Sequence, residues 1–67
     1  MNTEQTAVFI AWCIEEYAVY KHKTQKDTAN LFYQNGVLSF LQENADILHT
    51  QGKDYILGAI CDFMEVK

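Results

Sequence analysis

Residues 48–56 read Leu-His-Thr-Gln-Gly-Lys-Asp-Tyr-Ile, and they hold the end of one helix, a tight turn and the start of another. This segment carries one of the two histidines and one of the three glycines of the chain. Glycine adopts the left-handed conformation past a helix C-terminus at little cost, so Gly52 is expected to stop the preceding helix. On both sides the apolar residues recur every three or four positions, the period of an amphipathic helix. The segment is therefore predicted to be the corner where the chain folds back on itself.

The same apolar period predicts an all-α fold, a small bundle of about four helices with short, glycine-stopped loops. The expected helices span approximately residues 3–22, 25–35, 37–49 and 54–65. Asn2, with Gln5 three positions later, is expected to cap the first helix, and Thr24 the second. Gly36 is expected to end the second helix.

The first helix is the longest and carries a wide apolar face, so the others are expected to pack on it. Trp12, Leu48 and Ile60 lie on apolar helical faces and are predicted to be core residues. The whole chain, residues 1–67, is expected to form a single domain.

The composition favours a surface for a partner. A chain of 67 residues buries only about 60% of the surface that its unfolded form exposes, yet 49% of this chain is hydrophobic and 13% is aromatic. Tyr17, Tyr20, Tyr33 and Tyr55 suit an interface, because a tyrosine ring can be buried while its hydroxyl stays in water. An equally weighted interpretation is that these tyrosines only rim the core.

The charge argues against a nucleic-acid partner. The formal net charge is −4, and every basic residue is a lysine. Residues 24–48 could be a helix-turn-helix, but the exposed side of its second helix offers Glu43 and Asp46, which repel phosphate. The chain shows neither a signal peptide nor an apolar run of the ~20 residues that span a membrane. We therefore expect a cytoplasmic protein without a membrane or nucleic-acid partner.

The residue pattern predicts no catalytic, cofactor-binding or metal site. Cys13 and Cys61 lie far apart within apolar patterns, and neither has the spacing of a metal or redox motif. His22 and His49 share no ligand spacing with each other or with the cysteines. Ser39, the only serine, has no surroundings typical of a nucleophile. We therefore expect a protein that is not an enzyme.

The corner itself allows two interpretations. His49, Thr50, Gln51 and Tyr55 could present a polar cluster to a protein partner or a small ligand. The same residues are also explained by helix termination alone, and on the residues alone this interpretation is preferred.

Four segments, in their order along the chain, are similar to those of a known family. They are Phe9 with Cys13-Ile14-Glu15-Glu16-Tyr17, then Gly36-Val37-Leu38-x-Phe40-Leu41, then Asp46-Ile47-Leu48-His49-Thr50-Gln51-Gly52, then Tyr55-Ile56. With them the chain resembles a group of short bacterial proteins known as domain of unknown function 3791, of which the Leu-His-Thr-Gln-Gly segment is the most specific part. The chain departs from that pattern at Ala45, where a tyrosine is common, and at Gly58-Ala59, where acidic residues are common.

The resemblance implies a partner rather than a chemistry. Such proteins are similar to accessory or antitoxin-like partners encoded beside a larger protein, in some cases one of the ADP-ribosyltransferase-like type. We therefore expect a helical module that works by protein–protein interaction, as the neutralising partner of a toxin. Two alternatives stay open: a structural module that self-associates as a homodimer, and a ligand-binding or enzymatic domain that uses the His49–Gln51 corner.

Overall fold

The computed structural model describes residues 2–66, with side chains for residues 2–65. It consists of the helices α1 (Thr3–Tyr20), α2 (Gln25–Gln34), α3 (Val37–Leu48) and α4 (Lys53–Val66). The predicted all-α bundle of four helices is confirmed, and each boundary lies within two residues of its expected position.

Side-chain caps set where α1 and α2 begin. Asn2 Oδ1 accepts a hydrogen bond from the backbone N–H of Gln5 at 2.7 Å, and Gln5 Oε1 accepts one from the N–H of Asn2 at 3.3 Å. Thr24 Oγ1 accepts a hydrogen bond from the N–H of Asp27 at 3.0 Å. These bonds satisfy N–H groups that the first turn of a helix leaves without a partner. Both predicted caps are therefore present.

The expected glycine stops hold for one connection only. Gly36, with φ 73°, is left-handed at the boundary between α2 and α3, as expected. Gly52 does not have a positive φ, so its predicted role as a left-handed stop is wrong. The end of α1 instead uses His22, whose φ of 56° is the only positive value of a non-glycine residue in the described chain.

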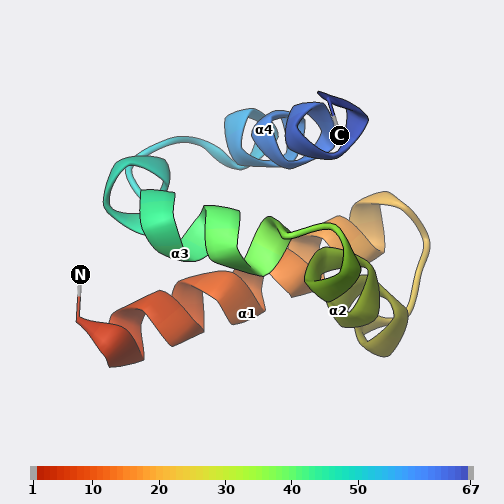
Figure 1. Cartoon of the computed structure of the whole chain (residues 1–67), viewed down its shortest axis with the longest axis horizontal. Helices are drawn as coiled ribbons and strands as arrows, with labels where there is room; N and C mark the ends of the chain where they lie inside the picture. Colours follow the sequence, from red (N-terminus) through yellow and green to blue (C-terminus); the bar gives the residue numbers. More distant parts are fainter. Residues whose placement is uncertain (1, 67) are drawn as a thin grey trace.

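The helices α1 and α3 form the centre of the bundle, and each contacts all the other helices. In Figure 1, α3 runs back across α1, and α4 runs back across α3. The expectation that the other helices pack on α1 is therefore confirmed, although α3 shares this role. Within residues 2–66, no helix is both long and apolar enough to cross a membrane.

The core lies where the inner faces of the helices meet. Its buried hydrophobic cluster consists of Phe9, Cys13, Tyr17, Phe32, Val37, Leu41, Ala45, Leu48, Ile56, Leu57 and Ile60. Leu48 and Ile60 are 5% and 0% exposed, which confirms their predicted place in the core.

Aromatic pairs join the outer helices to the centre. Tyr17 of α1 meets Phe32 of α2 edge-on, with ring centroids 5.1 Å apart. Phe40 of α3 stacks on Phe63 of α4, with centroids 4.5 Å apart. Such pairs add about 0.5–1.5 kcal/mol each beyond the area that they bury.

Trp12 does not belong to the core, contrary to the prediction. Its side chain is 36% exposed, although its ring stacks 6.3 Å from that of the buried Phe9. The inner face of α1 is filled by Phe9, Cys13 and Tyr17, which follow one another at intervals of four residues. Trp12 is one position before Cys13, and one position rotates a side chain by about 100° around the helix. It therefore points away from the centre of that face.

Candidate functional site

The corner, residues 48–56, uses its polar side chains to end α3. His49 Nδ1 lies 2.8 Å from the carbonyl oxygen of Ala45. A carbonyl oxygen only accepts hydrogen bonds, so Nδ1 carries the proton in this contact. Thr50 Oγ1 donates a hydrogen bond to the carbonyl oxygen of Ile47 at 2.7 Å. Both side chains thus bond to carbonyl groups in the last turn of the helix.

Gln51 and Gly52 complete the chain reversal without an unusual backbone. The N–H of Gln51 donates to the carbonyl oxygen of Leu48 at 2.9 Å, and Gln51 Nε2 lies 3.4 Å from Thr50 Oγ1. The carbonyl oxygen of Gly52 accepts a bond from the N–H of Ile56 at 3.1 Å, which starts α4. A Cβ atom on Gly52 would meet open space. Neither φ nor steric crowding therefore requires a glycine at this position.

The structure separates the tyrosines that the sequence grouped. Tyr55 and Tyr20 are 61% and 54% exposed, whereas Tyr17 is only 5% exposed and packs on Phe32. The ring of Tyr17 lies on the inner face of α1, so it offers little area to a partner, and its place in an interaction surface stays a prediction. Burial raises the pKa of the Tyr17 hydroxyl, and the neighbouring Cys61 and Tyr20 raise it further.

The start of α4 lies against α1. Lys53 Nζ forms an ion pair with Glu16 Oε1 at 3.6 Å. A shallow hollow at this contact is lined by Glu16, Val19, Tyr20, Lys53, Asp54 and Leu57. The structure therefore brings Tyr20 beside the first turn of α4, next to the corner.

A line of exposed side chains on α1 was not among the predicted sites. We call it the outer seam, and it consists of Glu4, Val8, Trp12, Glu15 and Val19. The intervals of four, four, three and four residues place these side chains on one face of the helix. All of them are exposed, including Val8 at 66% and Val19 at 71%. The signal was present in the sequence, since α1 carries apolar residues at helical spacing on two faces.

The two thiols of the chain differ in their burial. Burial raises the pKa of the Cys13 thiol to about 12, which suppresses the reactive thiolate at neutral pH. Cys61 is half-buried, and both cysteines are free. Among the described residues, no group of three or more His, Cys, Asp and Glu side chains is placed to hold a metal ion.

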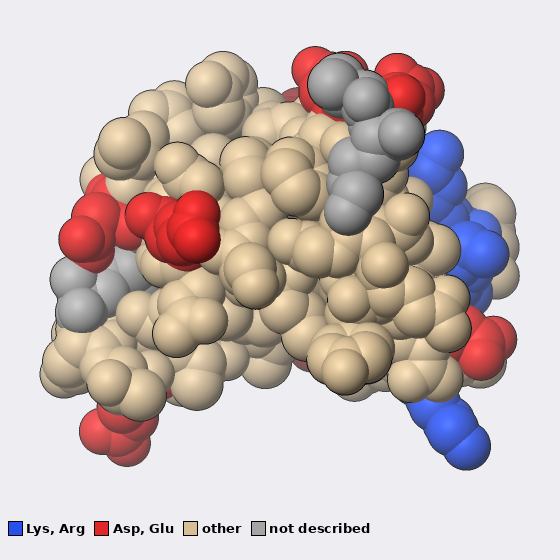
Figure 2. All heavy atoms as spheres, in the orientation of Figure 1, with Lys and Arg blue, Asp and Glu red and all other residues tan. Residues whose placement is uncertain are grey.

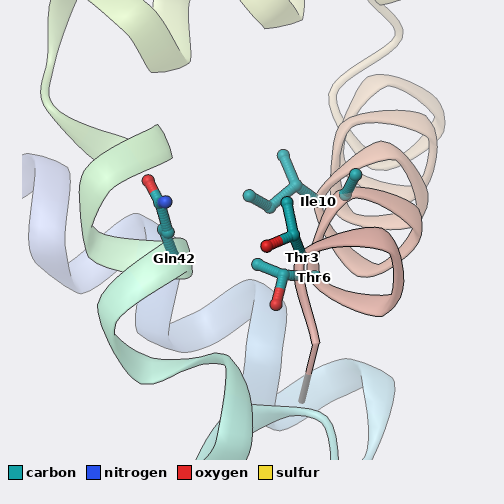
Figure 3. A pocket seen from close by; sticks show the side chains of 5 residues that line it. Thr3, Thr6, Ile10 and Gln42 are labelled. Carbon is teal, nitrogen blue, oxygen red and sulfur yellow. The ribbon is translucent and has the colours of Figure 1, made fainter.

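A hollow between the first half of α1 and α3 is lined by neutral side chains. In Figure 3, Thr3, Thr6 and Ile10 of α1 face Gln42 of α3 across this hollow. The Thr6 hydroxyl donates to the carbonyl oxygen of Asn2 at 2.9 Å, so it takes part in the start of the helix. General acid–base catalysis needs a titratable group, and the lining of this hollow supplies none.

Charged side chains are distributed unevenly over the molecule. Figure 2 shows lysines on the side where the connection between α1 and α2 lies, with an acidic side chain among them, and acidic side chains elsewhere on the same face without a lysine beside them. Lys21 and Lys23 belong to that connection, and Lys26 lies in the first turn of α2. By contrast, α1 contains Glu4, Glu15 and Glu16 and no lysine.

Comparison with protein families gives one match over most of the chain. The family model described as "Protein of unknown function (DUF3791)" matches residues 8–67, a range that includes part or all of every helix. Comparisons with curated proteins and with solved structures returned no match. The family match spans far more than half of the sequence and confirms the family that the sequence resembles. The chain therefore belongs to the DUF3791 family, whose members are described as proteins of unknown function.

Proposed function

We propose that this chain is a protein-binding module and that the outer seam of α1 is its binding surface. The observation that carries the proposal is that α1 has apolar side chains on its solvent side as well as on its core side. Exposed apolar side chains that lie together and are bordered by charged residues are typical of a surface that contacts another protein. The exposed side of α1 therefore suits contact with another protein.

The arrangement of these side chains matters more than their number. Single exposed hydrophobic residues are ordinary on protein surfaces. Val8, Trp12 and Val19, however, share one face of one helix, whereas Tyr33 and Ile47 are exposed on other helices. Tryptophan is also enriched among the residues that contribute most to protein–protein affinity.

The proposed role in the cell is that of an accessory partner, as an antitoxin is to its toxin. This role rests on the resemblance to proteins encoded beside a larger protein. The free thiols of Cys13 and Cys61 fit a reducing cytoplasm. The acidic net charge of −4 suits a basic partner protein and disfavours a nucleic acid.

A small-ligand site at the corner has weaker support. The side chains of His49 and Thr50 bond to carbonyl groups of α3, and Gln51 lies against Thr50. These contacts favour the interpretation that the corner ends a helix.

Co-expression with the product of the adjacent reading frame tests the proposal. In a Trp12→Ala, Val19→Ala double variant, we expect the two proteins to stop co-purifying and toxicity to return. The matched control is Tyr33→Ala with Ile47→Ala, which removes exposed apolar side chains from α2 and α3. Partner binding that survives the α1 changes, or is lost in the control, would contradict the proposal.

A further inference from the structure

We infer that the outer seam binds a cationic amphipathic helix, with apolar residues along its centre and lysine or arginine at its edges. This inference rests on the proposed function and names the chemistry of the partner. The seam runs from Glu4 to Val19, a length of about 22 Å at the rise of an α-helix. Its spacing matches the line of contacts that one helix offers to another lying alongside it. A helix of about four turns would cover it.

The charge along the seam has one sign. Glu4 lies at one end, and Glu15 lies between Trp12 and Val19. Two lysines lie against the C-terminal end of α1: Lys53 is paired with Glu16 at 3.6 Å, and Lys21, which follows the helix, places its Nζ 4.9 Å from the centre of the Tyr20 ring. Neither of them belongs to the outer seam. An apolar line that carries carboxylates and has no compensating lysine on its own helix is complementary to an apolar line flanked by cations.

The same charges disfavour a second copy of this chain as the occupant. Two copies that met through the outer seam would each bring Glu4 and Glu15 to the interface, and residues 3–20 would supply no cation from either copy, since the first lysine, Lys21, follows the end of α1. Carboxylates that lose water without a partner are costly to bury. A phosphate backbone or an anionic lipid surface would be repelled, because it carries the same sign of charge as Glu4 and Glu15.

The single tryptophan of the chain lies in the seam, so its fluorescence reports directly on occupancy. The probe is a synthetic helical peptide of about four turns with leucine along one face and lysine on both edges. A second peptide carries glutamate in place of each lysine. We expect the basic peptide to shift Trp12 emission to shorter wavelength in a saturable way, and the acidic peptide to leave it unchanged. Raising the salt concentration should weaken the basic complex.

Charge-reversal variants locate the binding. Glu15→Lys should weaken the basic peptide at least tenfold. The matched control is Glu43→Lys on the exposed side of α3, which changes the net charge equally, from −4 to −2. We expect the control to change affinity less than twofold. If Glu15→Lys fails to fold by circular dichroism, Glu15→Gln tests the same position and should give a smaller loss.

Three results would overturn the inference: equal binding of the acidic peptide, an equal loss in Glu43→Lys, or a concentration-dependent shift of Trp12 emission with dimer formation in sedimentation. The two proposals fail separately. If the neighbouring protein is released by Trp12→Ala with Val19→Ala but tolerates Glu15→Lys, the protein-binding function stands and the cationic partner does not. If it tolerates both changes, the outer seam is not the binding surface.

Discussion

At the scale of single residues, His22 occupies a position that normally favours glycine. The N–H of His22 donates to the carbonyl oxygen of Val19 at 3.3 Å, and the N–H of Lys23 donates to that of Ala18 at 2.8 Å. This pair of bonds is typical of helices that end on a left-handed glycine. A left-handed conformation costs a non-glycine residue about 1–2 kcal/mol. The end of α1 therefore holds strain in the backbone of an exposed histidine.

His22→Gly should stabilise the protein. Glycine removes the strain but loses more conformational entropy on folding, so the net gain should be about 0.5–1 kcal/mol. In a domain of this size that gain raises the thermal midpoint by roughly 2–8 °C. Calorimetry or thermal circular dichroism would measure the shift. His22→Ala keeps the Cβ atom and is the control, and an equal gain in this variant would show that strain is not the cause.

The two cysteines should differ sharply in reactivity. With a pKa of about 12 for Cys13, only about one molecule in ten thousand carries its thiolate at pH 8. A thiol reagent should therefore label the native protein at Cys61 alone and label both residues in denaturant, as mass spectrometry would show. Native labelling that persists in Cys61→Ala would mean that Cys13 is accessible.

The raised pKa of Cys13 also sets a pH dependence for stability. In the unfolded chain this thiol ionises near its ordinary pKa of 9.0, whereas in the folded protein it stays protonated up to about 12. The unfolded chain therefore releases the proton first, so stability is kept below pH 9 and is lost progressively toward pH 12. A Cys13→Ala variant should lack this part of the alkaline loss.

At the scale of helices, the sequence predicts those features that depend on hydrogen bonds between residues close together in the chain. The caps Asn2 and Thr24 bond to backbone groups three positions away, so their roles are readable without knowing the fold. Gly36 is also predictable from the sequence, because its left-handed backbone conformation is one that glycine adopts easily. Gly52 could not be read this way, because ordinary right-handed residues turn the chain at the end of α3.

The outer seam of α1 escaped prediction for a different reason. Helical periodicity shows that a face is apolar, but it does not say which of two apolar faces meets the core. The sequence predicts Trp12 in the core because this residue lies on an apolar face of the helix. The face of α1 that meets the core instead carries Phe9, Cys13 and Tyr17, and Tyr17 packs there on Phe32, a residue of another helix. The candidate binding surface therefore depends on tertiary structure, whereas the helix boundaries do not.

The corner at the end of α3 supports a prediction that separates stability from binding. Thr50→Val removes the hydroxyl that bonds to the Ile47 carbonyl, and His49→Ala removes the ring that bonds to the Ala45 carbonyl. Each change should lower the free energy of unfolding by about 0.5–1.5 kcal/mol, the net value of one hydrogen bond. Partner binding should be unchanged once the protein is folded. If partner binding were lost while stability stayed unchanged, the corner would belong to the binding surface.

At the scale of the whole molecule, a small core leaves little stability to spare. A domain of 67 residues has about 3–10 kcal/mol in total. The buried cluster contains side chains from every helix. A substitution that removes one of these side chains therefore weakens the contacts among the helices. The outer seam contributes far less to the stability of the fold, because its side chains stay exposed to water in the folded protein. Stability and partner binding should therefore depend on different residues.

Two alanine variants test that division. Ile60→Ala empties a fully buried site and should cost about 2–5 kcal/mol, enough to unfold much of the protein. Trp12→Ala should cost only about 1 kcal/mol, whereas a tryptophan in a core would cost about 3–5 kcal/mol. Urea denaturation measures both, and an unchanged slope would show that the same surface is exposed on unfolding. A loss above about 3 kcal/mol for Trp12→Ala would return this residue to the core, and the outer seam would then serve folding rather than a partner.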